Sequence, residues 1–156
     1  MSQKLVSYNT TEVKRSYYLN LFSANAEKTL KGTKNSVFRW SIRDLQLGSI
    51  AEIAIVQMTH TNATNTTGYA IRCLETYQDG WDSYNQTSAI LYLGLGLNAP
   101  SNPTYHKLIS NNLNTITLVV TDDLTSATTV NNGFGTTITF ALVLHIIDYQ
   151  DNQNTY

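Results

Sequence analysis

The residues that could do acid–base or nucleophilic chemistry are few and lie far apart in the sequence. The chain of 156 residues has three histidines, His60, His106 and His145, and a single cysteine, Cys73. A nucleophilic site needs a Ser or Cys beside a base, and no G-x-S-x-G segment is present. Cys73 has apolar neighbours in a predicted strand, so we expect it to be an inert core residue. The sequence therefore predicts no enzyme and no catalytic residue.

Motifs for metals and phosphates are weak as well. The sequence has no C-x-x-C or H-E-x-x-H pair. Asp79 and Asp82, or the pair Asp122-Asp123, could offer carboxylates to calcium, but the remaining oxygen ligands do not follow, and turn formation explains them more simply. The run GLGLN at 94–98 lacks the Lys and Ser/Thr of a phosphate loop. We therefore expect no metal and no cofactor.

One segment combines aromatic and acidic residues as a contact loop would. It covers 77–87 and reads YQDGWDSYNQT. Trp81 and Tyr84, beside Asp79 and Asp82, could stack on a sugar ring or anchor a protein partner, since Trp and Tyr are frequent hot-spot residues. The alternative is that Trp81 packs back onto its own sheet. These four residues are the predicted partner or ligand contacts.

Charge is distributed unevenly along the chain, although the net charge is only −1. Up to position 43 there are eight basic and two acidic residues, a balance of +6, and from 44 onward two basic and nine acidic residues give −7. Such asymmetry can mark a particle that stacks on copies of itself, or simply scattered solvated charges. The predicted inter-subunit or interior-facing basic residues are Lys14, Arg15, Lys28, Lys31 and Lys34. The pI of about 6.3 argues against nucleic-acid binding.

The pattern of apolar residues predicts strands almost throughout. Only 13% of the residues are charged, and Thr and Asn, which suit strands and turns, supply much of the polarity. Phe38, Trp40 and Ile42 alternate with polar residues, as in a strand with one buried face. Eight strands are predicted, at 15–23, 36–45, 50–59, 68–77, 89–97, 105–109, 114–122 and 136–149. One short helix is predicted at 25–30, ended by Gly32.

Eight strands without crossover helices predict an all-β domain, an antiparallel β-sandwich of two sheets. With eight strands this is commonly a single jelly roll, and an immunoglobulin-like sandwich, usually about 100 residues long, is the main competitor. The predicted organisation is an N-terminal arm at 1–14, the jelly-roll domain at 15–149 and a polar C-terminal tail at 150–156. No apolar run approaches the ~20 residues of a membrane span, and no apolar signal core begins the chain.

Parts of the sequence resemble a known family. The segments AEIAIVQMTHTN (51–62), LNTITLVVTDDL (113–124), NNGFG (131–135) and TTITFALVLHIIDY (136–149) are similar to the single jelly-roll capsid proteins of large double-stranded DNA viruses that infect eukaryotes. The resemblance implies a penton, the homopentamer at each vertex of an icosahedral shell, with neighbouring capsid proteins as partners. It also implies a virion protein assembled in the host cytoplasm or nucleus, with an N-terminal arm facing the interior or a neighbour.

Two alternatives to a capsid subunit stay open at this point. A carbohydrate- or receptor-binding jelly roll would use the loop at 77–87 and Trp81. A cupin-like enzyme would need several histidines and a carboxylate on inward strand faces, and His60, His106 and His145 do not show that spacing.

Overall fold

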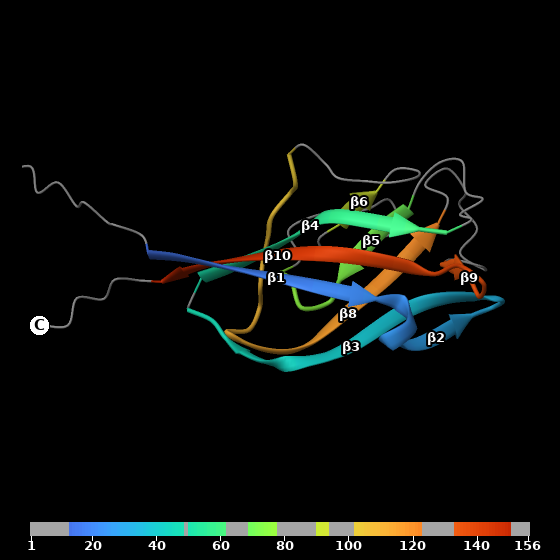
Figure 1. The fold of residues 1–156 in the computed structure, drawn as a ribbon, viewed down its shortest axis with the longest axis horizontal. Helices are drawn as coiled ribbons and strands as arrows, with labels where there is room; N and C mark the ends of the chain where they lie inside the picture. The colour runs from blue at the N-terminus through green and yellow to red at the C-terminus, as the bar shows by residue number, and fades with distance from the viewer. Residues whose placement is uncertain are drawn as a thin grey trace, which may run out of the picture.

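The computed structural model describes residues 13–48, 50–61, 69–77, 90–93, 102–122 and 133–150, which form strands and short connections (Figure 1). The strands are β1 (Val13–Phe22), β2 (Glu27–Lys31), β3 (Lys34–Gln46), β4 (Ile50–His60), β5 (Tyr69–Cys73), β6 (Ile90–Leu93), β7 (His106–Lys107), β8 (Asn112–Asp122), β9 (Phe134–Gly135) and β10 (Phe140–Gln150). A single 3₁₀ turn, η1 (Ser23–Asn25), follows β1. In these residues no helix has the length and apolar character needed to cross a membrane.

The strands form two antiparallel sheets, as the sequence predicts. One sheet has the order β1-β10-β4-β7, and the other has the order β2-β3-β8-β5-β6, with β9 also paired to β3 (Figure 1). Without β2 and β9, the remaining strands taken in chain order pair first with eighth, second with seventh, third with sixth and fourth with fifth. This nested pairing is one long hairpin rolled into two sheets, which is the jelly-roll arrangement.

Each of the eight predicted segments overlaps one observed strand. The alternation that predicted β3 is also confirmed, because Phe38 and Trp40 are buried and Arg39 is exposed. In β10 every second residue is buried, namely Phe140, Leu142, Leu144 and Ile146, so this strand also turns one row of side chains toward the core.

The predicted helix at 25–30 is wrong. Only Ser23–Asn25 turns, and residues 27–31 form the edge strand β2. Gly32, with φ of 64°, makes the tight turn that pairs Lys31 with Lys34 and sends the chain into β3. The local helix preference of Ala, Glu, Lys and Leu is worth only tenths of a kcal/mol per residue, and pairing with β3 outweighs it.

The core lies between the two sheets. It contains the inward side chains of β3, β4, β8 and β10, and four aromatic rings gather at one end of it. Phe38 lies at the centre of that group, with ring centroids at 4.8 Å from Phe140, 5.9 Å from Phe134 and 6.1 Å from Trp40. The interleaved rings fix how the second sheet sits on the first.

Both ends of the described chain leave the sandwich at the same place, because Val13 is paired with Gln150 (Figure 1). Residues 13, 14 and 150 therefore belong to strands rather than to the predicted arm and tail. The remainder of the arm, 1–12, and of the tail, 151–156, lie outside the described residues.

Candidate functional site

The predicted contact loop falls almost entirely outside the described part of the chain. Asp79, Trp81, Asp82 and Tyr84 belong to 78–89, so their placement is not described. Only Tyr77, the first residue of the loop, is described. Its ring is 47% exposed, and the Lys107 ammonium lies 5.2 Å from the ring centroid.

The predicted basic residues lie on three strands that share one flank of the sandwich. Lys14 and Arg15 belong to β1, Lys28 and Lys31 to β2, and Lys34 to β3. β1 is the edge strand of one sheet, and β2, which is paired with β3, is the edge strand of the other. The two sheets are linked on this flank by the Trp40 indole N–H of β3, which donates to the Phe22 carbonyl of β1 (2.9 Å). Of the described acidic residues, Asp44 lies in β3, on this same flank.

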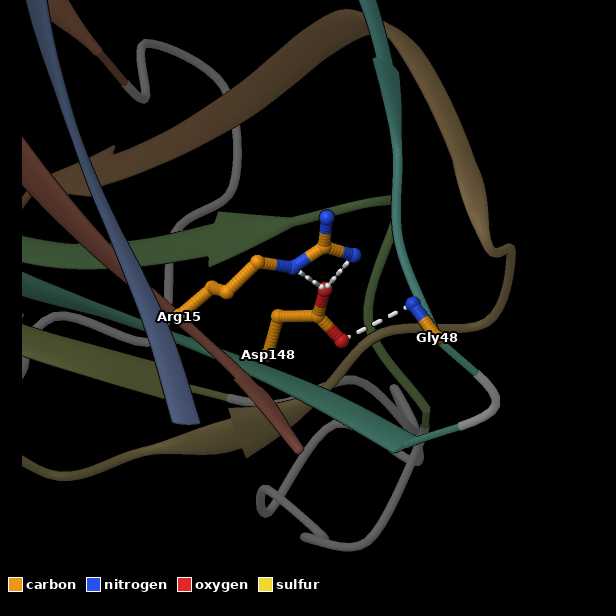
Figure 2. A network of polar contacts seen from close by, with 3 residues as sticks. All are labelled: Arg15, Gly48 and Asp148. Atoms are coloured by element: carbon orange, nitrogen blue, oxygen red, sulfur yellow. Dashed lines mark hydrogen bonds and ion pairs between the residues drawn. The ribbon is translucent and has the colours of Figure 1, made fainter. Parts of the chain in front are cut away.

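Arg15 makes an ion pair within the molecule. Its Nε and Nη2 both donate to Oδ2 of Asp148, at 3.1 and 2.7 Å, and the Gly48 N–H donates to Oδ1 at 2.8 Å (Figure 2). The Asp148 side chain is 0% exposed. Three donors satisfy a carboxylate that would otherwise be costly to bury. The network joins β1, β10 and the middle of the β3–β4 connection, and we interpret it as structural.

Cys73 lies in the core, as predicted. Burial, followed by the charge of Glu75, raises the pKa of the Cys73 thiol well above its ordinary range. The thiol donates to Glu75 Oε2 (3.3 Å), and the same oxygen accepts the Thr117 N–H (2.8 Å). A protonated, buried thiol is a poor nucleophile.

The three histidines occupy different places. His106 belongs to β7, His60 to the end of β4 and His145 to the middle of β10. Among the described residues no three His, Cys, Asp or Glu side chains come together as metal ligands would.

His145 is the centre of an aromatic belt that crosses the outer face of the four-stranded sheet. Tyr18 of β1 stacks on the imidazole, with ring centroids 4.5 Å apart and planes at 11°. On the other side the Tyr105 hydroxyl is 2.7 Å from His145 Nδ1. We call Tyr18, His145 and Tyr105 the belt.

The belt spans the width of its sheet. Tyr105 directly precedes β7, and β4 separates β7 from β10. A side chain from position 105 that reaches His145 must therefore cross β4, where Ala54 is the register partner of His145 and is fully buried. A larger side chain at position 54 would block the path. Burial, followed by Tyr18 and Glu52, raises the pKa of Tyr105, so its hydroxyl stays protonated.

The belt has part of the geometry of a nucleophilic pair. Ser16 Oγ lies 3.2 Å from His145 Nε2, while Tyr105 holds the other ring nitrogen. Acyl transfer also needs hydrogen-bond donors aimed at the oxyanion that develops on the substrate. Ser16 instead lies within the paired part of β1, where its register partner in β10 is Ile147. We therefore interpret the belt as a rigid aromatic surface that hydrogen bonds hold in place.

Beside the belt, the outward face of β1 carries two exposed aromatic rings, with Asn20 between them. Leu19 and Leu21 face the core, so Tyr18, Asn20 and Phe22 face outward. Tyr18 is 62% exposed and Phe22 is 52% exposed. We call Tyr18 and Phe22 the β1 row. Phe22 also lines a shallow cavity of about 310 Å³ with Thr59, Thr61 and Thr139.

A second apolar surface lies on the outer face of the other sheet. The Leu74 N–H donates to the Thr117 carbonyl (3.0 Å), which continues the pairing of β5 with β8. Since Cys73 and Leu118 face the core, Leu74 faces outward. The Ile109 N–H donates to the Glu75 carbonyl (2.9 Å) and so holds Ile109 beside this turn.

Leu74 and Ile109 are 52% and 54% exposed and line a cavity of about 250 Å³. The rest of its lining comes from the start of β8 and the residues around it: Glu75, Ser110, Asn112, Leu113, Asn114 and Thr115. We call this cavity the hollow.

Sequence reasoning missed both the belt and the hollow. The belt joins residues 18, 105 and 145, and the hollow joins 74 and 109, so each depends on long-range register. The one available signal was an aromatic residue at an outward position, Tyr18. No family model matches the sequence, and the search of curated proteins returned no match.

Proposed function

We propose that this protein is a structural subunit of an icosahedral viral capsid, and that it assembles as the homopentameric penton at the vertices. Its partners would be further copies of itself and neighbouring capsid proteins. Its place would be the virion, after assembly in the host cytoplasm or nucleus.

The observation that carries the proposal is the nested strand order, combined with exposed apolar side chains on both outer faces. The jelly roll is an architecture that viral capsid proteins use. Tyr18, Phe22, Leu74 and Ile109 are each more than half exposed, and covering such side chains between subunits would stabilise an assembly. The sequence resemblance to penton proteins points the same way.

The test is the mass of the purified protein. A pentamer of a 17.4 kDa chain would appear at about five times the monomer mass by mass photometry, and negative-stain images would show rings with fivefold symmetry. A protein that stays at 17.4 kDa at high concentration would contradict the proposal.

The second candidate function is binding of a glycan or a host receptor through the loop at 77–87. Tyr77 favours it, because an aromatic ring that is 47% exposed offers a stacking surface at the start of that loop. A glycan array probed with the wild type and with Trp81→Ala would test it. Binding that depends on Trp81 would support the loop, and an array without binding would exclude the glycans it carries.

A further inference from the structure

The backbone of β1 has an open edge. In the described part of the chain β1 pairs with β10 alone, because it is the outermost strand of its sheet (Figure 1). Successive residues of a strand direct their N–H and C=O groups to opposite sides. Every second residue of β1 therefore bonds to β10, and the residues between them direct their backbone groups away from the sheet.

Two contacts identify the residues that face the edge. The Phe22 carbonyl accepts a hydrogen bond from the Trp40 indole of the other sheet, so it points away from β10. Tyr18 and its register partner His145 are stacked with ring centroids 4.5 Å apart. In an antiparallel ladder, opposed side chains come closest at the pairs that exchange no backbone hydrogen bonds. Both contacts place the same alternate set of β1 residues at the edge.

The exposed backbone groups at this edge belong to Ser16, Tyr18 and Asn20, which alternate in step with Phe22. None of their N–H and C=O groups has a hydrogen-bond partner among the described residues. The edge also lacks the features that normally prevent strands from pairing. No charged residue and no Pro occurs at 16–22, and the pairing with β10 runs from end to end without a bulge.

Beside this edge the sandwich is incompletely covered. β2 pairs with β3 only as far as Arg39. Tyr17 and Leu19 of β1 and Ile42 of β3 pack against the core but are only partly buried. A strand added to β1 would turn every second side chain toward this inner side. Apolar residues at those positions would complete the burial, and the contact would be stabilised in proportion to the apolar area removed from water.

The charge on this flank adds one condition. Lys28 of β2 is the register partner of the buried Phe38, and its side chain is exposed. Phe38 lies two positions from Trp40, which contacts the Phe22 carbonyl, so the ammonium belongs to the Phe22 end of the edge. A carboxylate at that end of an added strand would meet an opposite charge.

We propose that β1 is a docking edge for an extended segment of a different polypeptide, which joins the four-stranded sheet as a further strand. The segment carries apolar residues at alternate positions, no charge along its middle and an acidic residue at one end. Main-chain hydrogen bonds to Ser16, Tyr18 and Asn20 hold it, and its alternate side chains give the selectivity. The inference goes beyond the capsid role and does not depend on it.

Amide hydrogen exchange of the full chain tests the edge itself. In dilute protein the Tyr17 and Leu19 amides, which face β10, should exchange slowly, and the Tyr18 and Asn20 amides should exchange fast. Slow exchange of Tyr18 and Asn20 in dilute protein would mean that the chain covers its own edge. Protection that grows with protein concentration would mean that a second copy covers it. Either result overturns the proposal.

A displayed library of random peptides of about 12 residues, long enough to cover an edge strand, is the probe for the segment. Peptides enriched on the immobilised full chain should carry apolar residues with a period of two. Adding such a peptide should slow the exchange of the Ser16, Tyr18 and Asn20 amides. The proposal is overturned by a library that yields no binder, by enriched peptides without that period, or by peptides that leave these amides unprotected.

Proline substitution separates the edge from the ladder. Asn20→Pro removes an edge-facing N–H and should lower peptide affinity at least about tenfold. Its thermal melt should stay near that of the wild type, because Pro is tolerated where the N–H faces away from the sheet. Leu19→Pro removes an N–H that faces β10 and should unfold the protein. Unchanged affinity in Asn20→Pro overturns the proposal, and the exchange measurement on the wild type decides the case if that variant does not fold.

A charge reversal tests the acidic end of the segment. Lys28→Glu should weaken the selected peptides severalfold. Lys107→Glu is the matched control, because β7 lies at the opposite edge of the same sheet from β1, and it should bind the peptides as the wild type does. Equal effects of the two variants would overturn the assignment of the carboxylate to the Phe22 end.

Discussion

Asp148 shows how much one buried carboxylate depends on its donors. It accepts two hydrogen bonds from Arg15 and one from the Gly48 N–H, and its side chain is fully buried. Sequence reasoning placed Arg15 among residues that face a neighbour or the interior. It could not identify the partner, because 133 positions separate the two residues.

We predict that Asp148→Asn destabilises the protein by about 2 kcal/mol. Breaking a buried ion pair costs about 3–5 kcal/mol, but the Arg15 side chain is 43% exposed and water can replace part of the loss. Urea unfolding followed by tryptophan fluorescence measures the change. Arg15→Lys keeps the charge but loses the two-pronged donor, so it should cost less. Equal losses for both variants would contradict this assignment.

Cys73 gives a prediction about pH. Burial and Glu75 raise the pKa of its thiol in the folded protein, while the unfolded thiol ionises near its ordinary pKa of about 8.5. Below that pH both states hold the proton. Above it only the unfolded state loses the proton, so the free energy of unfolding should fall by up to about 1.4 kcal/mol per pH unit.

The measurement is the difference in this slope between the wild type and Cys73→Ala, from urea melts between about pH 8 and 10. Tyrosine ionisation contributes to both proteins and cancels. A wild type whose slope equals that of the alanine variant would show that the folded thiol ionises as freely as the unfolded one.

At the scale of elements, the sequence predicted the eight jelly-roll strands but not their partners. Alternation of apolar residues is a local property, and it identified strands such as β3 and β10. Pairing is set by which faces meet across the core, so the neighbours of β10, which are β1 and β4, could not be found locally. β2 was predicted as helix, and β9 is too short, at two residues, to show any alternation.

β9 is positioned by a glycine with no room for a side chain. Gly133 has a φ of 131°, and a Cβ there would overlap the Asn35 carbonyl. Asn35 is also the register partner of Phe134, whose buried ring packs against Phe38. The close approach of the two backbones therefore places an aromatic ring of the core.

We predict that Gly133→Ala destabilises the protein by about 3 kcal/mol, because backbone strain and overpacking act together. The matched control is Gly135→Ala, two residues further on in β9. Its Cβ would meet the Ile138 side chain at ordinary contact distances, 3.7 Å from Cδ1 and 3.9 Å from Cγ1, so stability should change by no more than about 0.5 kcal/mol. Thermal melts compare the two variants, and similar losses would mean that the close approach at Gly133 does not limit the fold.

For the whole molecule, two driving forces for assembly can be distinguished. The uneven charge of the chain suggests electrostatic attraction between basic and acidic parts of neighbouring copies. In the folded molecule the basic strands β1, β2 and β3 share a flank, but Arg15 neutralises Asp148 and Asp44 lies on the basic flank. The apolar row and hollow offer a different force, which depends on burial of surface.

Salt separates these two forces. Raising NaCl from about 0.05 to 0.5 M shortens the screening length to a few ångströms, so a ring held by exposed charges should dissociate. A ring held by burial of exposed apolar side chains such as Tyr18 should keep its mass, and sulfate should strengthen it, because excluded salts favour burial of apolar surface. We predict the second behaviour, measured by mass photometry near the dissociation midpoint. Dissociation in NaCl would instead assign the assembly to the basic strands, and Lys28→Glu would then weaken it more than Tyr18→Lys.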